Sequence, residues 1–294
     1  MLHGWIILDK PLGFGSTTAV SAVKRILREA GEPKTKVGHG GTLDPLASGV
    51  LPIALGEATK LCGRMLDATK EYEFTIRFGE ETDTLDAEGE TIATSAVRPA
   101  RADIEAALPR FTGQIEQVPP AYSALKIDGK AAYARARSGE QVEMKSRATT
   151  IFELRVIDAT EDSATLAAAV SKGTYIRSLA RDIAHALGTV GHVTYLRRTR
   201  AGPFSFQQAI SLDFLEEAAK ARALTRTVLP LTAALDDIPA LPVTPDQAQL
   251  LRHGQRLSGF PAKPGLGLAM LEETPVALVE ASADGLKVVR GFNL

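Results

Sequence analysis

Cysteine is almost absent from the chain, since Cys62 is the only one among 294 residues. A single thiol excludes a disulfide within the chain and any zinc cluster built on cysteines. It suits a reducing compartment, so we expect a cytoplasmic protein. The apolar residues 5–8 near the N-terminus are too few for a signal peptide, and no apolar run approaches the roughly 20 residues of a membrane helix.

The motifs of several common enzyme classes are missing as well. The chain has no GxGxxG and no GxxxxGK[ST], so a nucleotide-cofactor site has no support, and no GxSxG to anchor serine hydrolase chemistry. Its five histidines form no HxH or HxxxH arrangement, so we expect no metal site. The chemistry has to be sought in acidic, basic and aromatic side chains.

Net charge is close to zero, but the charges are unevenly distributed. The formal total of −1 argues at first against a nucleic-acid partner. Residues 172–203, however, hold six basic side chains against one acidic one, and residues 126–155 hold seven against four. Residues 67–105 are acidic, with four basic and eleven acidic side chains. Basic segments attract phosphate through the local potential, although solvated faces of unlike charge would explain the same pattern.

Hydrophobic periodicity predicts a mixture of strands and helices. Ser16 would cap the first helix and Gly31 would end it. Non-local strands with helices between them predict an α+β fold with a mixed, largely antiparallel sheet. The expected strands cover residues 4–10, 71–79, 150–159, 163–176 and 192–205, and the expected helices cover residues 16–31, 101–111 and 175–188.

Two further segments differ from this pattern. Residues 117–147 contain paired prolines, an IDGK turn and many basic side chains, which predicts an exposed hairpin or loop with a helical piece. Residues 232–245 are typical of a linker, and a short helix and a hairpin with Asp-Gly at its turn follow. We therefore expect a smaller, β-rich unit at the C-terminus.

Residues 37–60 combine His39, Asp44 and Pro45 with five glycines. One interpretation is structural, because Asp at the N-cap and Pro at the first helical position are a favoured helix start. The other is catalytic, because a carboxylate can attack the anomeric carbon of a sugar or serve as a base. Glycines before Asp44 would let a substrate approach closely. The pattern alone leaves both interpretations open.

Four other side chains are candidates for the same site. Arg177 lies where a strand, a turn and a helix start meet, so it could pair with Asp44, although a surface position on an amphipathic helix is equally compatible. His39 could be a base, a nucleic-acid contact or a polar turn residue. Tyr72 and Tyr175 sit in apolar patterns and would ordinarily be core aromatics, but their rings could also stack on a base.

Six blocks of the sequence together resemble the bacterial tRNA pseudouridine-55 synthases, the TruB family. They occur in the family's order and cover residues 6 to about 206, with Gly40 and Ser48 in place of the more usual Thr. The blocks are ILDKPLGFGST, GHGGTLDPLASGVLPIALGEATK, KEYEF, QVPPAYSALKIDGKAAY, SKGTYIRSLARDIAHALG and HVTYLRRTRAGPFS.

The resemblance implies an isomerase that converts one uridine in the T loop of tRNA to pseudouridine, with no cofactor and no metal. Asp44 would be the catalytic carboxylate, and Arg177 would pair with it. Tyr72 would stack on the flipped base, and Tyr175 and Leu196 would line the base pocket. His39 would help to open the T loop, which takes the base out of its stack before the chemistry.

The resemblance also implies a domain organisation and a partner. Residues 1–235 would form a catalytic domain with the pseudouridine synthase fold and an RNA-gripping insertion at about residues 120–148. Residues 240–294 would form a small PUA-like domain. The expected partner is the T stem-loop of tRNA, with no membrane or protein partner, and the chain is expected to be a monomer. The alternative function is a tRNA-folding chaperone without chemistry, which the same basic surfaces would serve.

Overall fold

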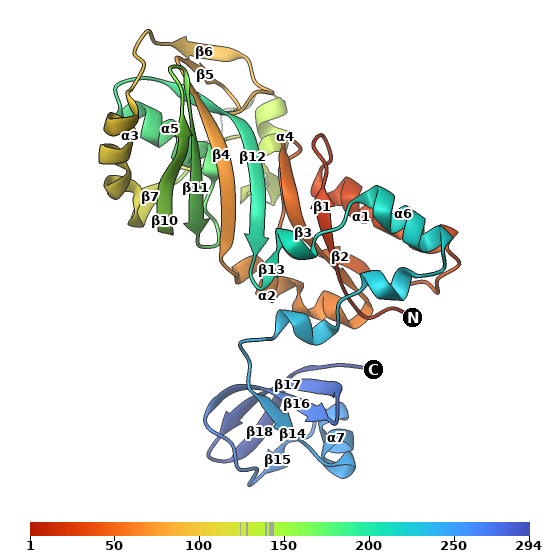
Figure 1. Ribbon diagram of the computed structural model, residues 1–294. Helices are drawn as coiled ribbons and strands as arrows, with labels where there is room; N and C mark the ends of the chain where they lie inside the picture. The colour runs from red at the N-terminus through yellow and green to blue at the C-terminus, as the bar shows by residue number, and fades with distance from the viewer. Residues whose placement is uncertain (124, 128, 139, 141–143) are drawn as a thin grey trace.

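The computed structural model describes residues 1–123, 125–127, 129–138, 140 and 144–294. Its largest sheet, within these residues, has nine strands. Its strands are β1 (Gly4–Lys10), β2 (Val37–His39), β3 (Ala47–Leu55), β4 (Lys70–Phe78), β7 (Gly113–Gln117), β10 (Arg147–Ala159), β11 (Ser163–Val170), β12 (Gly191–Ala201) and β13 (Phe204–Ser205). The order is β1-β3-β12-β4-β11-β10-β7, with β2 added to β3 and β13 to β12 (Figure 1).

The sheet is mixed but largely antiparallel, which confirms the prediction. Among the described strands of this sheet, only β3 and β12 pair in parallel, with Ala47 opposite Leu196. This pair joins the strand that follows the glycine-rich segment to the most basic strand of the chain. The predicted alternation in β4 is present too, with Phe74, Ile76 and Phe78 buried on one face.

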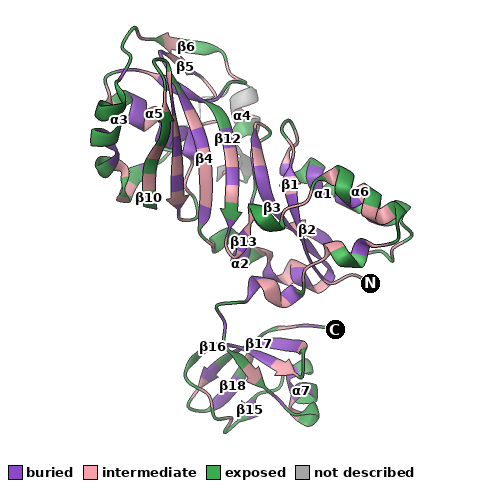
Figure 2. Ribbon diagram, in the orientation of Figure 1, coloured by how far each residue is buried: buried purple, intermediate pink, exposed green. Residues whose placement is uncertain are grey.

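Helices cover one face of this sheet and one of its ends. The helix α5 packs on β12 and β4, α3 packs on β10, and α1 with α6 lies beside β1 and β2 (Figure 1). Figure 2 shows exposed residues along β10, next to the buried stretches of the central strands. The helices are α1 (Ser16–Glu29), α2 (Cys62–Asp67), α3 (Arg101–Ala107), α4 (Ala132–Arg137), α5 (Ile176–Ala186), α6 (Leu212–Lys220) and α7 (Pro245–Arg252).

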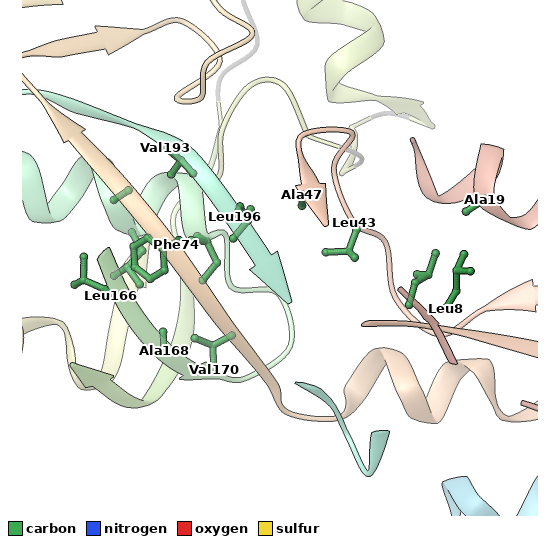
Figure 3. Close-up of a cluster of buried hydrophobic side chains, with 14 of the residues drawn as sticks. Leu8, Ala19, Leu43, Ala47, Phe74, Leu166, Ala168, Val170, Val193 and Leu196 are labelled. Carbon is green, nitrogen blue, oxygen red and sulfur yellow. The ribbon is translucent and has the colours of Figure 1, made fainter. Parts of the chain in front are cut away.

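The hydrophobic core continues from the sheet into the segment that carries Asp44. Leu43 and Ala47, on either side of that residue, are almost fully buried. Figure 3 shows them in one cluster, between Leu196 on β12 and Leu8 on β1. The flanks of Asp44 are thus fixed in the core, although its own side chain remains partly exposed.

A second, five-stranded sheet lies at the C-terminus, as expected for a small β-rich unit. Its strands are β14 (Ala240–Pro242), β15 (Leu257–Ser258), β16 (Gly265–Leu271), β17 (Thr274–Ser282) and β18 (Gly285–Gly291), in the order β14-β16-β17-β18-β15. Phe292, after the last strand, shares a buried cluster with Trp5 of β1 and Phe204 of β13. The Lys60 ammonium donates to the carbonyl of Gly291 at 2.8 Å. These contacts attach the second sheet to the first.

Short elements complete the described chain. They are the hairpins β5 (Glu80–Thr82) with β6 (Thr91–Thr94) and β8 (Lys126–Ile127) with β9 (Lys130–Ala131), and the 3-10 turns η1 (Gly56–Leu61), η2 (Leu108–Phe111), η3 (Phe206–Gln208), η4 (Leu224–Thr227) and η5 (Leu231–Ala234). Within the described residues, no helix has the length and apolar character needed to cross a membrane. The predicted linker at 232–245 is partly regular, because η5 covers its start, β14 lies within it and α7 begins at its last residue.

The structure corrects one prediction, at the start of the first helix, and adds detail to another, in the segment 117–147. Ser16 does not cap α1, because Gly15 occupies the cap position and the Ser16 hydroxyl is bonded to Leu43 instead. The segment 117–147 does contain a hairpin and a helical piece, β8, β9 and α4. Residues 124, 128, 139 and 141–143 of the predicted insertion lie outside the described residues.

Candidate active site

Asp44 occupies a tight turn, so the interpretation of the Asp-Pro step as a helix start is excluded. The Ala47 amide donates to the Asp44 carbonyl at 3.0 Å, and β3 begins at Ala47. Asp at the first position and Pro at the second favour such a turn, because Pro fixes φ near the required value. Two hydrogen bonds between Ser16 and the backbone of Leu43 hold the chain just before the turn, at 2.7 and 3.1 Å. The turn presents the carboxylate from a fixed backbone.

Arg177 pairs with Asp44, as predicted, and it also holds a second carboxylate. Its Nη2 lies 2.8 Å from Asp44 Oδ2, and its Nη1 lies 3.2 Å from Asp86 Oδ2. The same two nitrogens donate to the carbonyls of Tyr122 and Thr84, each at 2.8 Å. The Arg177 side chain is only 6% exposed, so the prediction of a surface residue is excluded. Four acceptors fix the guanidinium, and the guanidinium fixes Asp44.

The two carboxylates bound to Arg177 differ in their access to solvent. The Asp86 side chain is 7% exposed, and its Oδ1 accepts from the Thr84 hydroxyl at 2.6 Å and from the Glu88 amide at 3.1 Å. The Asp44 side chain is 39% exposed. Asp86 therefore serves as a buried anchor, and Asp44 is the carboxylate that a substrate can reach.

A cavity of about 350 Å³ opens in front of Asp44. Five of the six predicted site residues line it: Asp44, Tyr72, Tyr175, Arg177 and Leu196. They come from the turn before β3, from β4, from the start of α5 and from β12. Both tyrosines are half-buried, which leaves part of each ring open to a ligand. Leu125 and Arg147, at the two ends of the predicted insertion, also line the cavity.

His39 is the exception among the six. It ends β2, where it pairs with Ile53 of β3, and it is not among the residues that line the cavity. Burial and the nearby Arg198 guanidinium lower the pKa of its imidazole. His39 is therefore a half-buried, predominantly neutral side chain at neutral pH, beside the site rather than in it.

Sequence reasoning missed three buried cations at the site. Arg198 is 1% exposed, and it donates to the carbonyls of Val50 (2.7 Å), Gly41 (3.1 Å) and Thr42 (3.3 Å). It thereby holds the backbone that leads to Asp44. The sequence does not distinguish Arg198 from its neighbour Arg197, because both belong to one basic strand. In the structure Arg197 pairs with Asp9 instead of with the backbone before Asp44.

Lys10 and Lys70 are the other two cations that were not assigned a role. Both are nearly or fully buried, and burial lowers the pKa of each to about 8. The Lys10 ammonium donates to the carbonyls of Pro11 and Phe14, and Asp44 partly offsets its shift. A lysine at the end of a strand would ordinarily be exposed, so no sequence signal indicates this burial.

The glycines of residues 37–60 serve the protein's own packing as well as access for a substrate. A Cβ on Gly40 would lie 2.5 Å from Cβ of Met65, so no side chain fits there. Gly41 adopts a φ of 128°, which side-chain-bearing residues rarely adopt. The prediction that these glycines clear space for a ligand needs correction at Gly40, where the space is filled by α2.

The geometry is suited to chemistry on a sugar or a base. An ordered, accessible carboxylate beside a fixed guanidinium can act as a nucleophile or as a base. Aromatic faces at the same cavity can stack on a planar ring, and the buried cations favour an anionic ligand. Among the described residues, no group of three or more His, Cys, Asp or Glu side chains is arranged to hold a metal ion.

Comparison with protein families agrees with this site. Residues 24–176 match the TruB family pseudouridylate synthase N-terminal domain, and residues 177–236 match the tRNA pseudouridylate synthase B C-terminal domain. The chain belongs to the TruB family of pseudouridylate synthases. The resemblance seen in the sequence is thereby confirmed, together with the enzyme class, an isomerase.

Curated members of the TruB family are similar over the full length of the chain. The tRNA pseudouridine synthase B of Zymomonas mobilis is 61% identical over 99% of this chain and 96% of its own length. The protein of the same name from Novosphingobium aromaticivorans is 60% identical, over 100% of this chain and 98% of its own length.

Solved structures support the pseudouridine synthase fold. A chain in an H/ACA ribonucleoprotein bound to a substrate RNA that contains 2'-deoxyuridine has a TM-score of 0.76 and 26% identity, over 99% of this chain and 86% of that one. A chain of a Cbf5-Nop10-Gar1 complex has a TM-score of 0.73 and 28% identity, over 98% and 84%. The fold predicted from the sequence is therefore confirmed over both sheets.

Proposed function

We propose that the chain converts uridine 55 in the T loop of tRNA to pseudouridine. Membership of the TruB family and full-length relatives named tRNA pseudouridine synthase B support this substrate. One observation carries the proposal: the accessible carboxylate of Asp44, bonded to the buried Arg177 at 2.8 Å, lies in the wall of a cavity that Tyr72 also lines.

Asp44 breaks the bond between C1' of the ribose and N1 of the uracil. It does so by attacking C1' or by acting at the 2' position of the ribose. Its position is set before the substrate arrives, because Arg177 and the turn fix it. The Asp44 oxygen that does not contact Arg177 remains available to the ribose. Arg177 orients the carboxylate through a charge-assisted hydrogen bond of 2.8 Å.

The cavity walls handle the detached base. Tyr72 stacks on the uracil, while Tyr175 and Leu196 bound the space in which it turns. The uracil rejoins C1' through C5, and the proton on C5 then leaves, assisted by Tyr72. Product and substrate have the same atoms apart from proton exchange, so the reaction needs no net oxidant or reductant.

Regions outside the cavity bind the rest of the tRNA. The insertion at about residues 120–148 grips the RNA, with Arg147 at the cavity wall, and His39 helps to open the T loop from beside the site. We divide the chain into a catalytic domain, residues 1–235, and a PUA-like domain, residues 240–294. We further propose that it acts as a monomer in the cytoplasm.

The proposal is tested with a tRNA transcript that carries tritium at C5 of uracil. Pseudouridine formation replaces that hydrogen, so the wild-type chain is expected to release one tritium per tRNA into water. A matched transcript with cytidine at position 55 should release none. Binding of tRNA without release would leave the non-catalytic chaperone as the function, and release from the control transcript would refute the choice of position 55.

A further inference from the structure

The cavity wall carries two buried cations that have no acidic partner. Lys70 is 6% exposed and Arg198 is 1% exposed, and both line the cavity. The Lys70 ammonium donates to the carbonyls of Leu66 and Ala68, each at 2.6 Å. Among the described residues, neither cation forms an ion pair with a carboxylate. Buried cations are normally paired, because removing a charge from water is costly.

The two side chains lie against the same piece of backbone. A Cβ built on Gly41 would be 3.5 Å from Arg198 Nη1 and 3.8 Å from Lys70 Cε. Arg198 also contributes to lowering the pKa of Lys70, which reflects repulsion between the two charges. The fold thus holds like charges together at the cavity wall, next to the loop that leads to Asp44. Hydrogen bonds to carbonyls stabilise each cation, and a bound anion would also offset the repulsion between the two charges.

The other charges at the site do not neutralise this pair. Arg177 takes up both buried-site carboxylates, Asp44 and Asp86. The charge of Asp67 raises the pKa of Lys70, but Asp67 is exposed and pairs with Lys172 at 2.8 Å. The buried part of the site therefore retains an excess of positive charge on the Lys70 side.

We propose that Lys70 and Arg198 form a subsite for one backbone phosphate of the bound RNA, next to the nucleotide that Asp44 attacks. The inference rests on the proposed function, which makes the ligand of this cavity a polyanion. A phosphate accepts several charge-assisted hydrogen bonds at once, and Lys70 has a third N–H and Arg198 further N–H groups for it. Arg198 has a fixed geometry, and Lys70 acts as a point charge.

The phosphate subsite would position the RNA rather than select its sequence. With one phosphate held on the Lys70 side and the carboxylate of Asp44 on the other, the ribose between them has a defined orientation. Repulsion between the phosphate and Asp44 is limited, because Arg177 neutralises the carboxylate. Loss of Lys70 should therefore weaken RNA binding more than it slows the bound substrate.

The test is a cycle that combines a protein variant with a modified RNA. The full-length Lys70→Met chain is compared with wild type on a T stem-loop RNA in which single phosphates are replaced, one at a time, by neutral methylphosphonates. For unmodified RNA, Lys70→Met should weaken binding about tenfold and reduce the slope of log affinity against log salt by about 0.7. At one phosphate near the target uridine, the replacement should weaken wild-type binding and weaken Lys70→Met binding by clearly less, because only Arg198 then remains to contact that phosphate.

Two further variants guard the interpretation. Lys70→Arg should restore most of the binding, because it keeps the charge, and Lys24→Met, at an exposed lysine on α1, should bind as wild type. The thermal midpoint of each variant is measured first, and the RNA assays are run well below the lowest one. Penalties that multiply at every phosphate would overturn the subsite. So would a Lys70→Met chain that binds normally and only turns over slowly, since the ammonium would then act on the uracil.

The failure of this subsite is distinguishable from the failure of the proposed function. Wild-type tritium release is measured on the same unmodified RNA. If tritium release is normal but Lys70→Met and every methylphosphonate replacement weaken binding independently, only the phosphate subsite is refuted. Absence of release refutes the isomerase, whatever the binding cycle shows.

Discussion

The cavity and the junction between the two sheets bury different kinds of side chain. The cavity wall buries Arg177, Arg198 and Lys70, whose charges cost free energy to remove from water. The junction buries Trp5, Phe204 and Phe292 in a cluster of aromatic and aliphatic side chains. We infer that the apolar junction stabilises the fold, whereas the charged, preorganised cavity lowers its stability.

The junction combines a cluster of apolar side chains with a few hydrogen bonds, such as that from Lys60 to the Gly291 carbonyl. The rings of Trp5 and Phe204 lie 5.5 Å apart, between centroids, and are tilted by 47°. The indole N–H of Trp5 donates to the Leu231 carbonyl at 3.2 Å, so the one polar atom of the ring is satisfied. At the cavity, by contrast, each buried cation depends on several hydrogen bonds to be tolerated at all. Variants in the two regions should therefore separate activity from stability.

The largest effect is expected for Arg177→Met, which should affect both properties. Removal of the guanidinium leaves Asp86 buried without a counterion and Asp44 without its anchor. We expect the free energy of unfolding to fall by about 3–5 kcal/mol and tritium release to fall at least about hundredfold. Urea denaturation and the tritium assay measure the two effects. Near-normal release would show that Arg177 does not orient Asp44.

Phe292→Ala should lower stability and leave the chemistry intact. The ring is 1% exposed, so its removal leaves a cavity and should cost about 3 kcal/mol. Turnover of a saturating T stem-loop substrate, well below the thermal midpoint, should stay within about twofold of wild type. Val289→Ala, at a side chain of β18 that is 54% exposed, is the control and should change neither property. A loss of turnover in Phe292→Ala would mean that the junction also shapes the cavity.

Asp86→Asn should lower activity with a smaller effect on stability. The amide keeps the size of the side chain, but it removes the negative charge that pairs with Nη1 of Arg177. We expect about a tenfold loss in turnover, unchanged RNA affinity and a loss of about 1–3 kcal/mol in stability. Asp162→Asn, which alters an exposed ion pair with Arg98, should be close to wild type. Equal losses in affinity and turnover would assign Asp86 to RNA binding.

The smallest effect concerns pH and the buried Lys70. Its pKa is about 8 in the folded chain and close to 10.5 when unfolded. Below pH 8 both forms are protonated and the cost of burial is fully present; between pH 8 and 10.5 the unfolded chain holds more protons, so a rise in pH favours the fold. From pH 7.5 to 9.5, wild type should gain on the order of 1 kcal/mol relative to Lys70→Met. A difference that does not change with pH would contradict the burial of a charged lysine.

Much of the fold could be predicted from local pattern. The alternation of β4 and the amphipathic pattern of α5 predict which faces are buried, and both elements form where expected. The Asp-Pro step at Asp44 was interpreted as a possible helix start, although Asp followed by Pro also suits a turn. The turn forms instead because Leu43 and Ala47 enter the core on either side and β3 pairs with β12. That choice depends on tertiary contacts.

The charged half of the site could be predicted only in part. Arg177 lies where a strand, a turn and a helix start meet, which makes it a candidate partner for Asp44, and the family resemblance implies the pair. Asp86, Lys70 and Arg198 could not be assigned, since a charged residue in a strand or a turn is normally exposed. Their burial follows from the pairing of β3, β12 and β4, which closes one cavity around residues far apart in the chain. The local sequence around each of these residues does not predict that distant strands will enclose it.

The most direct test of the central claim is tritium release by Asp44→Asn on the T stem-loop substrate. The amide keeps the shape of the side chain and removes the nucleophilic, basic oxygen, while the cations that bind RNA stay in place. We predict that release becomes undetectable and that the affinity for tRNA stays within about threefold of wild type, since the charge of Asp44 lies against Arg177 rather than against RNA. Release by Asp44→Asn at more than about one-tenth of the wild-type rate would contradict the account, because another group would then have to break the glycosidic bond.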